Sequence, residues 1–196
     1  MKATSIGPIW RDMRGHAAKL RADRRGLAAV EFAFILPVMM VMLFGTVEFS
    51  SAIAIDRKVT LMARTLSDLT SQATTVSDSD LTNFFAASTG IMTPYPTTPL
   101  TTLRSTITQL YIDNSRVAKV KWSKGSEAIT VGTTVTIPDT LAVADTYLIF
   151  SQVSYKYLPT VGYVLAQSGI TMSDFAYTRP RQSSCVMYNT TVCTTL

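Results

Sequence analysis

The sequence predicts an α+β fold in which one long N-terminal helix packs against a small antiparallel β-sheet. Three observations support this fold class. Residues 27–49 form an apolar run long enough to cross a bilayer, a helical stripe of apolar residues continues to residue 74, and the apolar period becomes strand-like after residue 102. A helix resting on a sheet accounts for the last two patterns together, because each element buries the apolar face of the other.

The first 26 residues form a basic head. They contain seven of the 18 basic residues of the chain but only two of its 13 acidic residues, so the rest is balanced at eleven of each. The net charge of +5 therefore belongs to the head, and the folded domain is not expected to bind nucleic acid. By the positive-inside rule, the head stays in the cytoplasm and everything after the span is exported.

Apolar residues recur in this head at helical spacing, with basic residues between them: Ile6, Trp10, Met13, Ala17 and Leu20. The pattern indicates an amphipathic helix at a membrane surface. A disordered basic leader, or a start at Met13, remains the alternative.

Residues 27–49 are the candidate transmembrane helix. At 1.5 Å per residue they cover roughly 35 Å, which suits a bilayer core. The ionisable residues of this run are Glu31 near one end and Glu48 at the other. Pro37 lies inside the run and frees the carbonyl of Ala33, so we expect the helix to kink or loosen there.

Three interpretations of this segment compete. The first is a plain single-pass anchor. The second is a secretory signal peptide, because Ala52-Ile53-Ala54 matches the small-residue cleavage pattern, although the apolar run exceeds the usual 7–15 residues. The third, which we favour, is a leader that is cut after Gly26. A carboxylate in lipid costs about 2.5–3.5 kcal/mol, so a plain anchor would not be expected to keep Glu31.

The residues around this junction resemble a known family. Arg-Arg-Gly at 24–26, Ala-Ala-Val-Glu-Phe-Ala at 28–33, Pro37, and Phe-Gly-x-Val-Glu-Phe at 44–49 occur in that order. The pattern is similar to that of the TadE/TadG-like pilus-assembly proteins, which are pseudopilins of the tight-adherence (Tad, or Flp) class of type IV pili. It covers residues 24 to about 50, and weaker similar pieces occur at residues 155–159 and 179–181.

The resemblance implies a pilin-like fold and cleavage between Gly26 and Leu27 by a membrane prepilin peptidase. It implies a single-pass protein of the bacterial inner membrane with a periplasmic domain, which is either retained there or built into the pilus. The implied partners are other pilins of the Tad machine, the implied role is pilus priming or assembly in support of surface adherence, and no cofactor is expected. Glu31 and Phe32 are the implied assembly residues, although Flp-type prepilins usually carry Glu-Tyr where this chain has Glu-Phe.

Cleavage would leave a free ammonium on Leu27. A carboxylate in a low dielectric is stabilised mainly by a nearby opposite charge, and residues 27 and 31 lie one helical turn apart. Glu31 is therefore expected to pair with the Leu27 amine, either within one subunit or between adjacent subunits. The alternative is a Glu31 that lies at the headgroup level and is solvated.

The helix is expected to continue beyond the bilayer, so that one element covers residues 27–74. Its second half carries apolar residues at spacings of three and four: Ile55, Val59, Met62, Leu66, Leu69 and Ala73. A short coiled coil or self-associating stalk is the alternative. Residues 75–102 are rich in Ser, Thr and Pro and are expected to form a connection with a short helix, capped by Asp78 or Ser79.

Residues 103–196 are expected to form the β-rich exported domain. Strand patterns cover residues 107–112, 118–122, 129–137, 147–157 and 170–179, with a turn at 113–115. The fourth of these segments places Tyr147, Ile149, Val153, Tyr155 and Tyr157 on one face. In an exported compartment the only two cysteines, Cys185 and Cys193, are expected to form a disulfide that keeps the tail from fraying.

The sequence argues against an enzyme and against a metal site. The single histidine is His16, in the head that the favoured interpretation removes, and two cysteines without histidine cannot make a usual zinc site. Paired carboxylates are conceivable, with Asp139 and Asp145 as an example. The competing function is an uncleaved, membrane-anchored adhesin or envelope-binding protein, for which tyrosines 147, 155, 157 and 163 would supply an aromatic contact surface.

Overall fold

A computed structural model describes residues 25–98, 102–159, 169–191 and 193. The head residues before 25, and with them the amphipathic pattern and His16, lie outside the described residues, as does Tyr163. The chain divides into two compact units, and the division falls between Val47 and Glu48. The first unit contains the apolar half of one long helix, and the second contains the remainder of that helix and the sheets.

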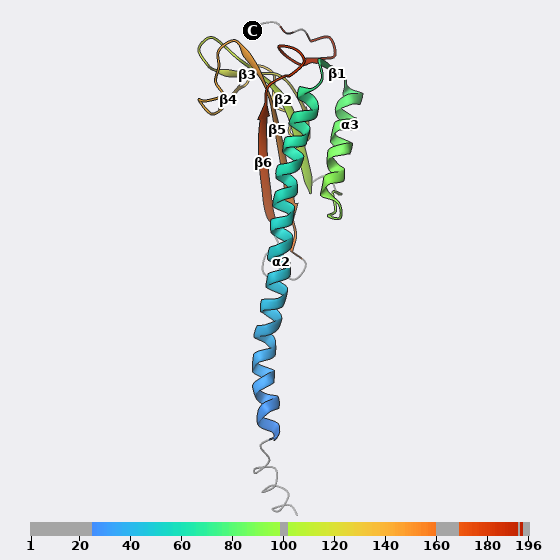
Figure 1. Cartoon of the computed structure of the whole chain (residues 1–196), viewed down its shortest axis with the longest axis vertical. Helices are drawn as coiled ribbons and strands as arrows, with labels where there is room; N and C mark the ends of the chain where they lie inside the picture. Colours follow the sequence, from blue (N-terminus) through green and yellow to red (C-terminus); the bar gives the residue numbers. More distant parts are fainter. Residues whose placement is uncertain (1–24, 99–101, 160–168, 192, 194–196) are drawn as a thin grey trace, which may run out of the picture. The chain divides into compact units, whose positions relative to one another are not determined.

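The long helix is α2, Arg25–Ser71, and it is continuous through Pro37 (Figure 1). It begins two residues before the predicted helix and ends three residues earlier, at Ser71. The end is fixed by contacts from distant parts of the chain, since the backbone N–H of Arg181 donates to the carbonyl of Ser71 at 2.9 Å. The Ser71 hydroxyl donates to the carbonyl of Asp68 at 2.8 Å, which satisfies another carbonyl of the last turn.

The connection after α2 contains strand β1 (Thr75–Val76), helix α3 (Asp78–Thr89) and a 3-10 turn, η1 (Gly90–Met92). The short helix was predicted, but its cap was wrong. Ser77 is the N-cap, and it forms a capping box with Asp80, whose carboxylate accepts from the Ser77 N–H at 2.9 Å. Asp78 instead occupies the first helical turn, where a negative charge is also favourable.

Five antiparallel strands form the main sheet in the order β4-β3-β2-β5-β6 (Figure 1). Their bounds are β2 Leu103–Ile112, β3 Ala118–Gly125, β4 Thr134–Val135, β5 Thr146–Tyr157 and β6 Ile170–Thr178. A second sheet pairs β1 in parallel with β7, Met187–Tyr188. The predicted α+β arrangement, a long helix against an antiparallel sheet, is therefore confirmed.

Residues 129–137 were expected to form a strand pair broken at Gly132, but only its second strand, β4, forms there. The chain does turn at Gly132, which takes a φ of +84° and whose N–H donates to the carbonyl of Val120. The apolar side chains of this segment, including Ile129 and Ile137, pack on the face of the sheet away from α2.

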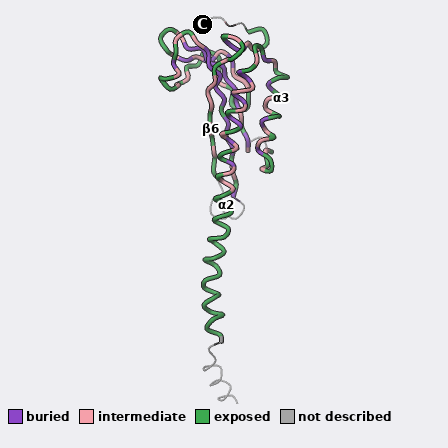
Figure 2. The backbone as a smooth tube through the Cα atoms, viewed as in Figure 1, coloured by how far each residue is buried: buried purple, intermediate pink, exposed green. Residues whose placement is uncertain are grey.

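The main core lies between the second half of α2 and the sheet, and Figure 2 shows buried backbone on both elements. Four residues of the predicted helical stripe are fully buried there: Ile55, Val59, Met62 and Leu66. They pack with sheet residues such as Ile107, Ile149, Val153 and Tyr155. Leu69 and Ala73 are only half-buried.

Polar contacts fix the position of α2 along the direction of strands β5 and β6. The Ser151 hydroxyl donates to the carbonyl of Ala63 at 2.6 Å, and Ser67 donates to the Thr178 hydroxyl at 2.7 Å. The Thr60 hydroxyl donates to a carboxylate oxygen of Asp174 at 2.5 Å. Because a buried hydroxyl without a partner is costly, these bonds select one register of helix on sheet.

The C-terminal tail is bound to the same core. Cys185 and Cys193 form the predicted disulfide, with their Cα atoms 6.0 Å apart. The indole N–H of Trp122 lies within hydrogen-bond distance of the Gln109 amide oxygen, at 2.8 Å, and of the Val186 carbonyl, at 2.9 Å. The segment before β7 is therefore held by both a covalent and a polar link.

Candidate membrane and assembly interface

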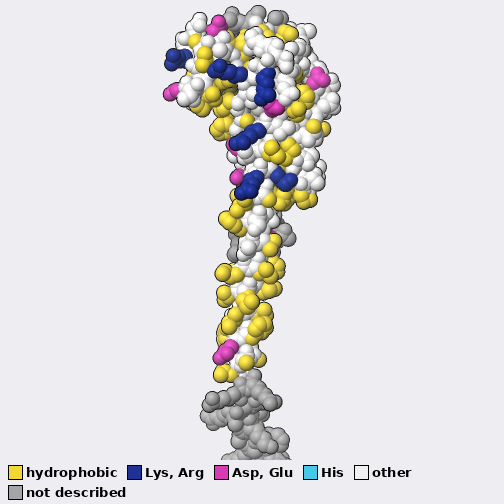
Figure 3. Space-filling view, viewed as in Figure 1, with side chains coloured by type: hydrophobic (Ala, Val, Ile, Leu, Met, Phe, Trp, Pro, Cys, Tyr) yellow, Lys and Arg dark blue, Asp and Glu magenta, His cyan; other side chains and the backbone are white. Residues whose placement is uncertain are grey.

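The apolar half of α2 has no cover within the described residues, since every residue from 26 to 47 is exposed. It belongs to the one helix, in the described part, whose length and composition suffice to cross a membrane. Hydrophobic side chains cover the visible face of this unit (Figure 3). An apolar surface of this extent requires lipid or other apolar helices around it, because monomeric soluble proteins rarely expose contiguous apolar patches larger than a few hundred Å².

The predicted processing and assembly residues lie together at the start of this helix. Gly26 is in the first turn of α2, and a Cβ added there would meet nothing within 4 Å, so its backbone is open to approach. Leu27 is 60% exposed, and Glu31 follows it by one turn and is exposed too. Phe32 lies next to Glu31 on the helix surface, and in the described part of the chain Glu31 makes no ion pair.

A second carboxylate, Glu48, begins the second unit and accepts a hydrogen bond from the hydroxyl of Tyr157. Burial of the Tyr157 ring, together with this bond, raises the pKa of Tyr157 to about 12. Sequence reasoning treated Glu48 only as the end of the span. Its partner lies 109 residues away, and no periodicity signals a pairing at that separation.

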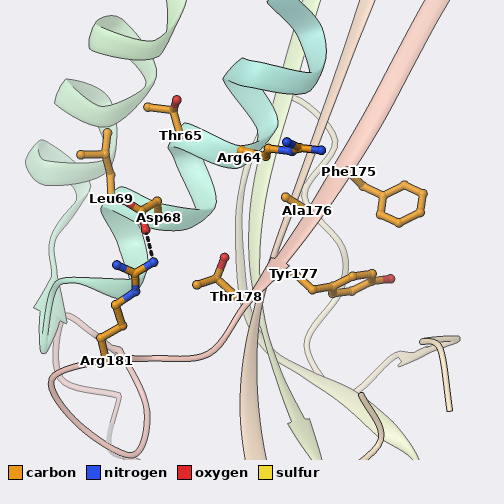
Figure 4. Close-up of a pocket in the computed structure, with 9 residues that line it drawn as sticks. All are labelled: Arg64, Thr65, Asp68, Leu69, Phe175, Ala176, Tyr177, Thr178 and Arg181. Atoms are coloured by element: carbon orange, nitrogen blue, oxygen red, sulfur yellow. Dashed lines mark ion pairs between the residues drawn. The ribbon is translucent and has the colours of Figure 1, made fainter. Parts of the chain in front are cut away.

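A groove of about 620 Å³ lies between α2 and the edge strand β6 (Figure 4). At one end of the groove Arg181, in the segment after β6, pairs with Asp68 of α2, with nitrogen and oxygen 2.5 Å apart. Phe175 and Tyr177 point to the side of β6 away from α2, and Arg64 projects from the helix. None of the sequence-predicted site residues lines this groove.

Three of the other sequence-predicted candidates, Asp145, Tyr147 and Tyr155, make contacts inside the second unit. The Tyr111 hydroxyl donates to Asp145 at 2.8 Å, and this bond, with burial, raises the pKa of Tyr111 to about 12. Tyr147 and Tyr155 are buried, so these two do not contribute to an exposed aromatic surface. Among the described residues, no three His, Cys, Asp or Glu side chains are grouped so as to hold a metal ion.

The comparisons with known proteins bear on α2. A family model described as "TadE-like protein" matches residues 26–66, which is the apolar half of α2 and most of its amphipathic half. Neither the curated proteins nor the solved structures contain a match to this chain. The resemblance of this chain to the TadE-like family, inferred from its basic junction and apolar span, is therefore confirmed over residues 26–66.

Proposed function

We propose that this chain is a minor pilin or pseudopilin of a Tad pilus, anchored in the inner membrane by residues 27–49 until it joins the assembly. The observation that carries the proposal is an apolar helix exposed on all sides, inside a TadE-like segment, with one carboxylate near its start. In this role the chain packs α2 among the helices of other pilins and primes or caps the filament. The second unit is then periplasmic.

Processing between Gly26 and Leu27 is the first step of this function. The bond lies at the start of the described part of α2, where the side chains from Gly26 onward are exposed. A membrane aspartic peptidase would bind this segment in an extended form. The absence of a side chain on Gly26 leaves the backbone accessible to that peptidase.

The new Leu27 ammonium then becomes the partner of Glu31. Either pairing, within the helix or with the next subunit, offsets part of the roughly 2.5–3.5 kcal/mol that a carboxylate costs in lipid. Pairing between subunits also fixes the register of one helix on the next. This second effect explains how a single charge in an apolar surface directs assembly without adding stability to the isolated chain.

Mass spectrometry of the chain extracted from its native membrane tests the processing step. We expect the mass of a product that starts at Leu27. A product that retains residues 1–26 contradicts the proposal and favours the uncleaved anchor, and a product that starts at Ile55 favours a secreted protein.

The variant Glu31→Ala tests the charge pair. We expect it to insert in the membrane and to be cut normally but to yield no pili, because the register contact is lost. Met40→Leu, an apolar exchange in the same span, serves as the control and should yield pili at the wild-type level. Normal piliation by Glu31→Ala would contradict the pairing while leaving the processing step intact.

A further inference from the structure

We propose that the membrane-proximal ends of β5 and β6 contact the phospholipid headgroup layer through Lys156, Leu158 and Ile170. We call these three residues the strand-end patch. The inference rests on the membrane anchoring of α2 in the proposed function and adds an interaction surface to it. The patch is 100 residues or more from the span in sequence, so the span itself does not imply it.

The contacts between α2 and the sheet show which residues of α2 lie level with the patch along the helix axis. We call this position the height of the patch. Tyr157 bonds to Glu48, which places the end of β5 at the first residue of the second unit. Asp174 of β6 bonds to Thr60, and Ile170 precedes Asp174 by four residues, or about 13 Å of strand. The same 13 Å corresponds to about nine residues of helix, which brings Ile170 level with residue 51.

This height coincides with the headgroup layer. A bilayer measures about 40–45 Å with its headgroups and about 30 Å without them, so each headgroup layer is about 5–7 Å thick. If the apolar span ends at residue 49, residue 51 lies about 3 Å beyond the hydrocarbon. Ile170 therefore falls inside the headgroup layer, and Leu158, which follows Tyr157, lies at the same level or lower.

The chemistry of the patch also fits phospholipid. Leu158 and Ile170 are each 49% exposed at a strand end, where polar residues are ordinarily found. A Cβ added at Gly169 would lie 2.8 Å from Leu158 and 3.3 Å from Lys156, so these side chains gather at one place. Lys156 is exposed and makes no ion pair in the described part of the chain, which leaves its ammonium for lipid phosphate.

Two further features support a lipid occupant. Phe49 and Ile53 of α2 are exposed apolar residues at the same range of heights as the patch. Lys156 and Leu158 also line a cavity of about 360 Å³ together with Ser51 and Tyr157, which provides room for a headgroup between the strand end and α2. The second unit therefore carries exposed apolar side chains on α2, at Phe49 and Ile53, as well as at the ends of β5 and β6.

Photocrosslinking of the full chain in native membranes tests the proposal. A benzophenone amino acid replaces Leu158 in one variant and Ile170 in another. Val41, inside the span, is the positive control, and Val131, a 60% exposed residue of the segment before β4, is the matched negative control. After irradiation, intact-mass measurement shows whether a phospholipid mass has been gained.

We expect lipid adducts at positions 41, 158 and 170 and none at position 131. Adducts at 41 without adducts at 158 and 170 would overturn the strand-end patch while leaving the anchor intact, and so would crosslinks from 158 and 170 to another protein chain. An equal lipid adduct at 131 would show that the contact is not specific to the patch. No adduct at 41 would overturn the anchor itself, and the patch with it.

Discussion

At Gly125 the backbone of β3 passes so close to β2 that only a hydrogen fits on its Cα. A Cβ would lie 2.1 Å from the carbonyl oxygen of Ser105 and 2.7 Å from the Cα of Thr106, both of which are backbone atoms that cannot turn aside. The φ of +132° also lies in a region that side chains rarely adopt. Space and dihedral angle therefore both require glycine at the end of β3.

The variant Gly125→Ala is expected to lower the free energy of unfolding by about 3 kcal/mol or more, because backbone strain and overpacking add together. Gly132→Ala is the matched control. Its φ of +84° is also positive, but a Cβ there meets nothing within 4 Å, so we expect a loss of only about 1–2 kcal/mol. Denaturant unfolding of the full chain in detergent, followed by near-UV circular dichroism, measures both; equal losses would contradict the steric argument.

Tyr157 gives the fold a dependence on alkaline pH. Its pKa is raised from 10.0 to about 12, first by burial and then by the bond to Glu48. The unfolded chain therefore loses this proton near pH 10, whereas the folded chain keeps it until about pH 12. The stabilising contribution of Tyr157 is complete below pH 10 and is lost as the pH rises from 10 to 12.

The prediction is that Tyr157→Phe loses less stability than the wild type between pH 10 and 12. The pKa of Tyr111 is also raised to about 12, but it contributes to both proteins, so the difference isolates Tyr157. The free energy of unfolding against pH, measured for the two proteins in parallel, checks this. Identical slopes would mean that neither burial nor the bond to Glu48 raises the pKa of Tyr157 in the folded chain.

At the scale of elements, α2 changes its surroundings along its length. Up to Val47 it is exposed on all sides, and from Ile55 it buries a single stripe against the sheet. The sequence pattern changes at the same place, because residues 27–47 are apolar on all sides of the helix, whereas the residues from 55 onward are apolar on one side only. One continuous helix therefore combines a half that is exposed on all sides with a half that packs on the sheet along one stripe.

Two leucines of α2 allow its buried stripe to be compared with its exposed face. Leu66 is fully buried in the core between α2 and the sheet, whereas Leu61 is 53% exposed. We expect Leu66→Ala to cost about 2–5 kcal/mol of unfolding free energy and Leu61→Ala to cost less than about 0.5 kcal/mol. Thermal or denaturant unfolding of both variants measures the contrast, and a comparable loss at Leu61 would place that side chain in an interface.

Elements with a strong period could be predicted from the sequence, and elements fixed by distant contacts could not. Four stripe residues of α2 follow the 3.6 period, and alternation at residues 118–122 identified β3. The end of α2 could not be predicted, because it depends on Arg181, and neither could β7, whose partner lies at residues 75–76. The prediction of a strand pair at residues 129–137 was only partly right, because a segment rich in Val, Ile and Thr can also pack as a loop on the face of a sheet.

The residues of the candidate site also divide into those that the sequence indicates and those that only the structure reveals. The junction at Gly26 and the carboxylate of Glu31 stand out in the sequence because a charge in an apolar run is anomalous. Nothing in the local sequence distinguishes Tyr157, Leu158 or Ile170, since an apolar residue in a strand pattern is ordinarily expected to lie in the core, and the exposure of Leu158 and Ile170 is seen only in the structure. Their significance follows only from the register that the Thr60 and Glu48 bonds impose on the strands.

At the scale of the molecule, the second unit is closed by its C-terminal tail. The tail brings β7 to β1, places Cys185 in a buried cluster with Tyr111 and Tyr147, and receives the indole N–H of Trp122. These contacts connect residues beyond 180 to the segment directly after α2. The disulfide is therefore one of several links that hold the tail.

Replacement of Cys185 and Cys193 by serine is expected to cost roughly 2.5 kcal/mol on the chain-entropy model for a loop of this length. We expect the amides of β1 and β7 to exchange with solvent faster, while those of the central strands β2 and β5 keep their relative order of protection. Hydrogen exchange with mass spectrometry measures both regions in the same sample. Equal acceleration in β2 and β5 would mean that the tail supports the whole sheet.

The pairing of β1 with β7 has a consequence for biosynthesis. Residues 75–76 leave the ribosome more than a hundred residues before residues 187–188, so β1 lacks its described partner β7 while residues 77–186 are being made. The pairing must wait until residues 187–188 have emerged. Until then the edge of β1 that pairs with β7 stays open, which gives folding factors a defined period in which to act.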